Sequence, residues 1–130
     1  MNPFKTIGAV SWTELTTPDP AAAQAFYGPL FGWRFEPMPI GQGSYHVIKL
    51  GETDAIGGIL ATPPQAQGRP PMWGSYVTVA DCDATAAQCT ALGGKVCVAP
   101  TDIPNVGRFA MLQDPQGATL FVIAYLPELR

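Results

Sequence analysis

Glu14-Leu15-Thr16-Thr17-Pro18-Asp19 has a counterpart 62 positions later, Tyr76-Val77-Thr78-Val79-Ala80-Asp81, and this pairing decides the fold. The same ungapped shift places Gly32 on Gly94. Each stretch is typical of a strand that leads into a helix, because Asp is a favoured N-cap residue. Glycine commonly follows the last helical turn, so each helix is expected to end near its glycine. A period this long indicates a duplicated supersecondary module.

The remainder of each half follows one plan, βαβββ. Strands are expected at 9–16, 33–36, 44–50 and 55–61, and again at 74–79, 95–98, 108–113 and 118–125, with a Pro- and Gly-rich turn at 37–43. We predict one α+β domain over residues 1–130, in which module 8–62 and module 73–126 are joined by a Pro-rich linker. Each module alone would expose one face of its sheet. Two modules in tandem would bury those faces by forming a curled, mixed-sheet cup with the helices outside.

Composition limits the classes of function. The chain has 130 residues, of which 47% are hydrophobic and 13% charged, so we expect a real core and an apolar surface that suits a homodimer or a deep pocket. A net charge of −3 without a basic stripe argues against nucleic acid. No apolar run approaches the ~20 residues of a membrane span. Three cysteines without Cys-x-x-Cys spacing, and an N-terminus without a leader pattern, predict a cytoplasmic protein.

Two motifs resemble those of a known superfamily. Phe26-Tyr27-Gly28-Pro29-Leu30-Phe31-Gly32-Trp33 resembles the end of the first helix in the vicinal oxygen chelate (VOC) superfamily, the glyoxalase, bleomycin resistance protein and dioxygenase group. Residues 107–118, Gly-Arg-Phe-Ala-Met-Leu-Gln-Asp-Pro-Gln-Gly-Ala, resemble its final hairpin. The likeness runs from about Ala9 to Tyr125 and implies the cup-shaped fold of that group. It does not choose a reaction, because one fold hosts many chemistries.

The resemblance also implies where a metal would be held. Metal-dependent members take one ligand from the first strand and one from the last strand of each module, usually His, Glu or Gln. Counted from the helix-capping Asp19 and Asp81, the first-strand positions are Trp12 and Gly74. Counted from Asp114 of the hairpin, the last-strand position is Phe121, and the repeat shift of 62 gives Ile59 as its counterpart. None of these side chains offers a donor for Zn²⁺ or Fe²⁺. We therefore predict no metal, and no nucleotide cofactor either, because the glycine fingerprints for phosphate are missing.

An aromatic and apolar pocket is expected in place of the metal. Strand alternation puts Glu14 on the face of Trp12, and the repeat adds Tyr76. The predicted pocket residues are Trp12, Glu14, Ile59, Gly74, Tyr76, Met111 and Phe121. Glu14 is the candidate catalytic residue, since a carboxylate in apolar surroundings has a raised pKa and can act as a general base. A rim position paired with Arg34 or Arg108 is the alternative.

Three functions that involve a small molecule stay open at this point, beside a role in protein–protein interaction alone. The first is a glyoxalase- or bleomycin-resistance-like protein that binds a small organic molecule without a metal. The second is a metal-independent lyase or isomerase, in which Glu14 removes a proton and Tyr76 or Arg108 steadies the oxyanion. The third is a metalloenzyme whose ligands are displaced to His46, Glu14, Glu52 or Asp54.

Overall fold

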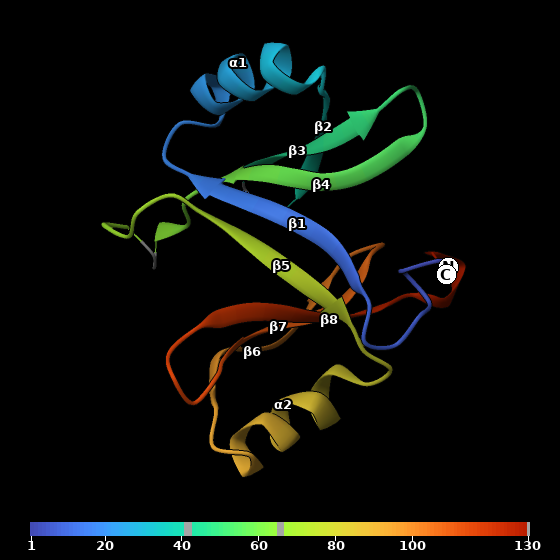
Figure 1. Ribbon diagram of the computed structural model, residues 1–130, viewed down its shortest axis with the longest axis vertical. Helices are drawn as coiled ribbons and strands as arrows, with labels where there is room; N and C mark the ends of the chain where they lie inside the picture. The colour runs from blue at the N-terminus through green and yellow to red at the C-terminus, as the bar shows by residue number, and fades with distance from the viewer. Residues whose placement is uncertain (41–42, 65–66, 130) are drawn as a thin grey trace. The chain divides into compact units, whose positions relative to one another are not determined.

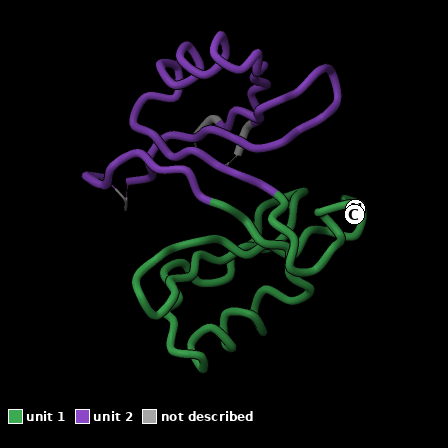
Figure 2. The backbone as a smooth tube through the Cα atoms, in the orientation of Figure 1, with its two compact units in different colours: residues 1–11, 75–130 green, residues 12–74 purple. Residues whose placement is uncertain are grey.

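The computed structural model describes residues 1–40, 43–64 and 67–129, and the chain divides into two compact units (Figure 2). Unit 2 spans Trp12–Gly74, and unit 1 combines Met1–Ser11 with Ser75–Arg130. Unit 2 carries most of the first predicted module, and unit 1 carries most of the second. The first residues belong to unit 1 because Thr78 hydrogen bonds to the backbone of Gly8 and Ala9, at 2.8 and 2.9 Å.

Unit 2 is a mixed sheet with one helix along one face (Figure 1). Its elements are β1 (Val10–Thr17, from Trp12 on), α1 (Pro20–Phe31), β2 (Arg34–Ile40), β3 (Gly43–Leu50) and β4 (Asp54–Ala61). The strand order is β2-β3-β4-β1, with β1 parallel to β4 and the other neighbours antiparallel.

Unit 1 repeats this plan. Its elements are β5 (Met72–Thr78, from Ser75 on), α2 (Cys82–Ala91), β6 (Lys95–Ile103), β7 (Gly107–Gln113), β8 (Thr119–Tyr125) and the 3₁₀ helix η2 (Pro127–Leu129). The order β6-β7-β8-β5, with β5 parallel to β8, matches the order in unit 2. The predicted α+β fold is therefore confirmed. Among the described residues, neither helix is long and apolar enough to cross a membrane.

The two helices begin as the sequence predicts. The side chains of Asp19 and Asp81 accept hydrogen bonds from the backbone N–H groups of Ala22 and Ala84, each at 3.0 Å. These bonds satisfy N–H groups that have no partner within the helix. After α1, Gly32 has a φ of 72°, in the left-handed region that ends many helices.

The edge strands run further than expected. β2 continues through Pro37 to Ile40, so the start of the predicted turn at 37–43 is wrong, while residues 41 and 42 lie outside the described residues. β6 likewise continues through Pro100 to Ile103. Both strands end the strand order, and a proline without an N–H is tolerated on such an edge. Residues 65 and 66 of the predicted linker are also outside the described part.

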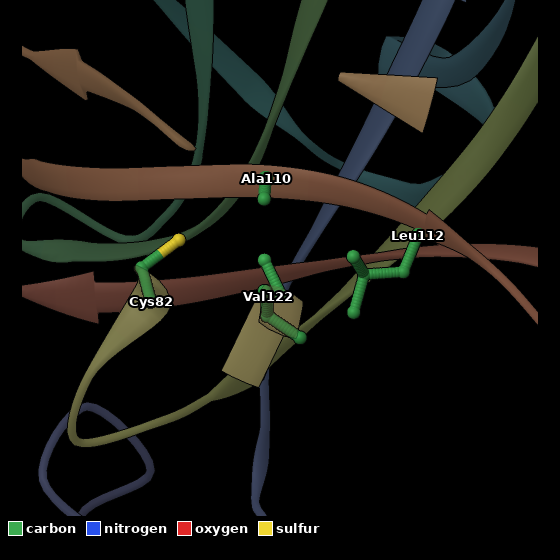
Figure 3. Close-up of a cluster of buried hydrophobic side chains, with 5 residues drawn as sticks. Cys82, Ala110, Leu112 and Val122 are labelled. Atoms are coloured by element: carbon green, nitrogen blue, oxygen red, sulfur yellow. The ribbon is translucent and has the colours of Figure 1, made fainter. Parts of the chain in front are cut away.

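Each unit has its core between the sheet and its own helix. In unit 2, Leu15, Ile48 and Ile59 pack with Ala23 and Tyr27 of α1. In unit 1, the buried residues are Cys82, Ala86, Ala110, Leu112 and Val122 (Figure 3). Cys82 is 2% exposed within this core, and its burial raises the pKa of the thiol.

Candidate functional site

The face of the unit 1 sheet that points away from α2 is aromatic. Ala110, Leu112 and Val122 pack toward α2, so strand alternation puts Met111 and Phe121 on the opposite face. Tyr76 pairs with Phe121 in the sheet, and their rings stack with centroids 4.5 Å apart and planes 11° from parallel. Three predicted pocket residues of unit 1 therefore share one face. We call it the α2-distal face, made of Tyr76, Phe109, Met111 and Phe121.

Phe109 is a member of this face that the sequence prediction missed. Its ring centroid lies 6.3 Å from that of Phe121, at 44°. The missed signal is simple alternation, because Phe109 precedes Met111 by two positions on the same strand. With Phe109 included, the α2-distal face carries three aromatic rings and a thioether; Phe109 and Phe121 are half-buried, and Tyr76 and Met111 are buried. Side chains of these kinds adapt to flat apolar ligands.

Arg108 lies on the other side of the sheet from this aromatic face. Its guanidinium donates two hydrogen bonds to Asp83 of α2, at 2.8 and 3.1 Å, and a third to Asp102 at 3.0 Å. Hydrogen bonds from Arg108 lower the pKa of the Asp83 carboxyl. The sequence suggested two roles for Arg108, pairing with Glu14 or steadying an oxyanion. With two carboxylates already bound, its guanidinium is poorly placed for either role. The other suggested partner, Arg34, donates instead to the Gly51 carbonyl.

The face of the unit 2 sheet that points away from α1 is more polar. Leu15, the residue after Glu14 on β1, packs against α1. Strand alternation therefore puts Trp12 and Glu14 together on the opposite face. The indole Nε1–H of Trp12 donates a 2.8 Å hydrogen bond to the hydroxyl oxygen of Tyr45. Glu14 is level with Gly58 across the β1–β4 pair. We call Trp12, Glu14, Tyr45 and Gly58 the α1-distal face; Trp12 and Glu14 are half-buried on it.

The register of β4 corrects the predicted position of Ile59. Ile59 pairs with Leu15, is fully buried and packs against α1, so it lies on the opposite face from Glu14. In unit 1 Tyr76 pairs with Phe121, and in unit 2 Glu14 pairs with Gly58, so Gly58 is the counterpart of Phe121. The shift of 62 that relates the first strands thus becomes 63 at the last strands. A one-residue change in register moves every side chain to the other face.

The position of the Tyr45 side chain leaves room only for a glycine at position 58. A Cβ atom added at Gly58 would overlap the ring and the hydroxyl of Tyr45. The neighbouring Gly57 is pressed against the backbone of Thr13 in the same way. Close backbone approach is a common reason for glycine within a strand. Tyr45 is a second residue that the sequence prediction missed, and the Gly57-Gly58 pair on the adjacent strand was the available signal.

Gly74 and His46 are two further candidate residues that the structure locates. The Gly74 carbonyl accepts a hydrogen bond from the hydroxyl of Thr13, at 3.4 Å, and Gly74 is buried. His46 pairs with Ile59 in the β3–β4 register, so it is on the α1 side of the sheet, away from Glu14. Among the described residues, no three His, Cys, Asp or Glu side chains come together as metal ligands. The displaced ligand set of His46, Glu14, Glu52 and Asp54 is therefore not assembled in this part of the chain.

The ligand positions that the resemblance implies stay an expectation, and the β4 register changes one of them. With Gly58 in place of Ile59, the expected positions are Trp12, Gly58, Gly74 and Phe121, and none of these side chains has an atom suited to a metal ion. The ring nitrogen of Trp12 carries a hydrogen that it gives to Tyr45, and Phe121 stacks on Tyr76. An indole N–H is a donor only and cannot coordinate a cation. That the protein holds no metal stays a prediction.

Relatives of known sequence span more than this chain. The chain is 43% identical over 122 residues to "Putative glyoxylase CFP32" of Mycobacterium tuberculosis, covering 93% of this chain and 46% of that protein. It is 30% identical over 132 residues to "Anthracycline biosynthesis protein DnrV" of Streptomyces peucetius, covering 88% and 46%. The chain thus spans about half the length of the curated relatives it matches.

Solved structures with the same fold are more distant in sequence. Methylmalonyl-CoA epimerase from Mycobacterium tuberculosis has a TM-score of 0.70 at 14% identity, covering 96% of this chain and 93% of that one. A methylmalonyl-CoA epimerase in complex with methylmalonyl-CoA and NH₄⁺ has a TM-score of 0.66 at 18% identity, covering 94% and 97%. The Glyoxalase model matches residues 9–122, nearly the whole chain. The chain belongs to the Glyoxalase/Bleomycin resistance protein/Dioxygenase superfamily.

Proposed function

We propose that this protein binds a small, flat organic molecule through aromatic side chains, without a metal ion. The stacked pair of Tyr76 and Phe121 carries the proposal, because Phe121 stands where metal-dependent relatives would place a ligand. Phe109 and Met111 extend the same apolar face. A planar ligand gains both apolar burial and ring stacking from such a surface.

The names of the relatives support a ring-shaped ligand. One relative is an anthracycline biosynthesis protein, and anthracyclines are fused, planar ring systems that carry carbonyl and phenol oxygens. The aromatic residues of the α2-distal face match the fused rings of such a molecule. We therefore choose doxorubicin, a fluorescent anthracycline, as the first probe.

The test is a fluorescence titration of doxorubicin with the protein. The protein should bind it saturably, and Phe121→Leu should weaken binding by about 2–10-fold, the range expected from 0.5–1.5 kcal/mol for an aromatic pair. Phe26→Leu is the matched control, since Phe26 is 61% exposed on α1 and should not matter. Equal binding by the wild type and Phe121→Leu would refute the aromatic site, and an absence of saturable binding would refute this ligand class.

Metal analysis tests the second half of the proposal. Protein loaded with a panel of divalent ions and then desalted should retain less than one ion per chain by mass spectrometry. Trp12, Gly58, Gly74 and Phe121 supply no side-chain donor, which is the reason for this expectation. A stoichiometric ion would overturn the proposal and would show that other residues had replaced the usual ligands.

A metal-independent lyase or isomerase is the alternative, with Glu14 as general base. Glu14 is half-buried on the face that carries Trp12 and Tyr45, where its carboxylate could remove a proton next to a carbonyl. Methylglyoxal, with and without a thiol, is the first substrate to test, because one relative is named as a glyoxylase. Glu14→Gln should abolish turnover and leave the fold intact. Glu36→Gln, which alters an exposed carboxylate paired with Lys49, is the control.

The assembly and the location also belong to the proposal. We propose that the protein is cytoplasmic and forms a homodimer. The apolar surface of α1 supports the dimer, because Phe26, Leu30 and Phe31 are each more than half exposed. Light scattering of the purified chain should give twice the mass of one chain. The monomer mass across a range of concentrations would refute the dimer.

A further inference from the structure

The side of α1 that faces away from its own sheet is apolar along the whole helix. Ala23 and Tyr27 pack on the sheet of unit 2, so one side of α1 is already covered (Figure 1). The exposed residues recur at the i, i+3, i+4, i+7 and i+8 spacing of one helical face, and they are Ala22, Ala25, Phe26, Pro29 and Leu30. We call these five residues the α1 stripe. A helix that is apolar on both sides is normally covered on both sides.

Comparison with α2 shows that the module folds without large apolar residues on the outside of its helix. Phe26 and Phe31 are 61% and 55% exposed, and the shift of 62 pairs them with Gln88 and Gly93. The sequence of α1 contains no charged residue, whereas α2 carries an exposed Asp83. The exposed aromatic side chains of α1 therefore serve a contact outside the unit, since exposed apolar patches commonly mark interaction sites.

The sizes of the side chains make the α1 stripe complementary to a second copy of itself. The two alanines lie toward the start of α1, and Phe26, Pro29 and Leu30 lie toward its end. When two copies pair antiparallel about a two-fold axis, the large end of each stripe fills the space beside the alanines of the other. A parallel pair would bring large residues against large ones. Because α1 has no charged residue, neither copy repels the other.

We propose that two chains associate through their α1 stripes, with the helices antiparallel, Phe26 near the two-fold axis and Ala22 of each chain against the partner's Leu30. This inference rests on the proposed homodimer and adds the surface, the residues and the orientation. A helix of 12 residues is about 18 Å long, so the contact is small for a specific interface. We therefore expect a dimer that dissociates on dilution.

Sedimentation equilibrium of the full chain at several concentrations measures the dissociation constant of the dimer. Leu30→Glu should raise that constant about 10–100-fold, because the carboxylate would lose water against an apolar surface. Leu92→Glu is the matched control, since Leu92 is the counterpart of Leu30 in the repeat, and it should change nothing. The two leucines are 56% and 72% exposed, so both variants should fold, and far-ultraviolet circular dichroism checks this.

A second substitution tests the antiparallel orientation. Ala22→Lys alone should also weaken the dimer, because it places a charge against the apolar end of the partner's stripe. The double variant Ala22→Lys/Leu30→Glu should dimerise about tenfold more tightly than Leu30→Glu, since each new lysine then meets a new glutamate of the other chain. Positions 22 and 30 are roughly 12 Å apart along the helix, too far for the two new side chains to pair within one chain.

The outcomes distinguish the interface from the dimer and from ligand binding. If the wild type dimerises but Leu30→Glu and Leu92→Glu behave alike, the α1 interface is refuted and the proposed dimer stands. If Leu30→Glu weakens the dimer and the double variant does not recover, the antiparallel arrangement is refuted. A wild type that stays monomeric at every concentration refutes the dimer and the interface together. Ligand binding is decided separately, by the doxorubicin titration.

Discussion

The two sheet faces that point away from the helices differ more than the strands that build them. In unit 1, Tyr76 is paired with Phe121, and the two rings stack to close the face with apolar surface. In unit 2, the corresponding pair is Glu14 and Gly58, and the ring above the glycine is Tyr45 from the next strand. One face is therefore aromatic, and the other carries a carboxylate and a hydrogen-bonded phenol.

The two faces differ in their side chains although the two units follow one plan. The strand order and the helix caps are the same in both units. A single step in the register of β4 removes an apolar residue, Ile59, from the α1-distal face and puts Gly58 in its place. The space above a glycine can then be filled by a side chain from a neighbouring strand, and here that side chain is Tyr45.

The largest expected effect tests the register itself. Ile59→Ala should lower the free energy of unfolding by about 2–5 kcal/mol, because Ile59 is fully buried between the sheet and α1. Leu60→Ala, at the half-buried neighbour whose side chain points to the other face, should cost clearly less. Urea denaturation measures both. If Leu60→Ala cost more than Ile59→Ala, the uniform shift of 62 positions would hold for β4, and Ile59 would belong to the candidate site.

The second prediction breaks the contact that distinguishes unit 2. Gly58→Ala should cost about 1–3 kcal/mol, because its Cβ overlaps the ring of Tyr45 and the core must be rearranged. The same change on a Tyr45→Ala background should cost much less, since the ring is gone. A double-mutant cycle by urea denaturation gives the coupling between the two sites. Additive costs would show that Gly58 is needed for another reason.

Much of the fold follows from local signals in the sequence. Asp19, Asp81 and Gly32 mark helix ends by chemistry that acts within a few residues, and the structure confirms each of them. Pro37 begins a Pro- and Gly-rich stretch whose composition predicts a turn, but a proline is tolerated on an edge strand, where its missing N–H is not needed for pairing. Whether a strand is at an edge depends on the whole sheet, which a local pattern does not reveal.

The candidate site was predicted less completely, because it depends on register between distant strands. Trp12 and Glu14 share a face by alternation alone, and that prediction needs only one strand. Ile59 was placed by an ungapped repeat, and a one-residue difference between the modules sent it to the core. Tyr45 was missed because its contacts with Trp12 of β1 and Gly58 of β4 cross between strands, which alternation along its own strand does not reveal.

The third prediction concerns a feature that both units share. Asp19→Ala and Asp81→Ala should each cost about 1 kcal/mol, since each removes one side-chain acceptor from a helix N-terminus. Similar losses, measured by thermal unfolding of both variants under one condition, would show that the first turns of the modules remain energetically equivalent. A loss confined to one variant would mean that the divergence reaches the helices as well.

The smallest effect concerns an ion cluster described in unit 1. Asp83 binds Arg108 through two hydrogen bonds, and they lower its pKa from the ordinary value of 3.8. The folded protein therefore holds this proton less tightly than the unfolded chain. The resulting stabilisation is complete above the unfolded pKa and is lost as the pH falls through the folded pKa. In the repeat, Ala21 and His46 take the places of Asp83 and Arg108, so unit 2 has no such pair at these positions.

Urea midpoints of the wild type should consequently fall more steeply between about pH 5 and about pH 3 than those of Asp83→Asn. The difference should be small, because Asp83 and Arg108 are exposed enough for solvent to screen their attraction. It should shrink further at about 1 M salt, where the Debye length is only about 3 Å. Equal slopes at low salt would mean that the two hydrogen bonds are offset by the cost of ordering the side chains. The ion cluster would then be a geometric difference between the units without an energetic one.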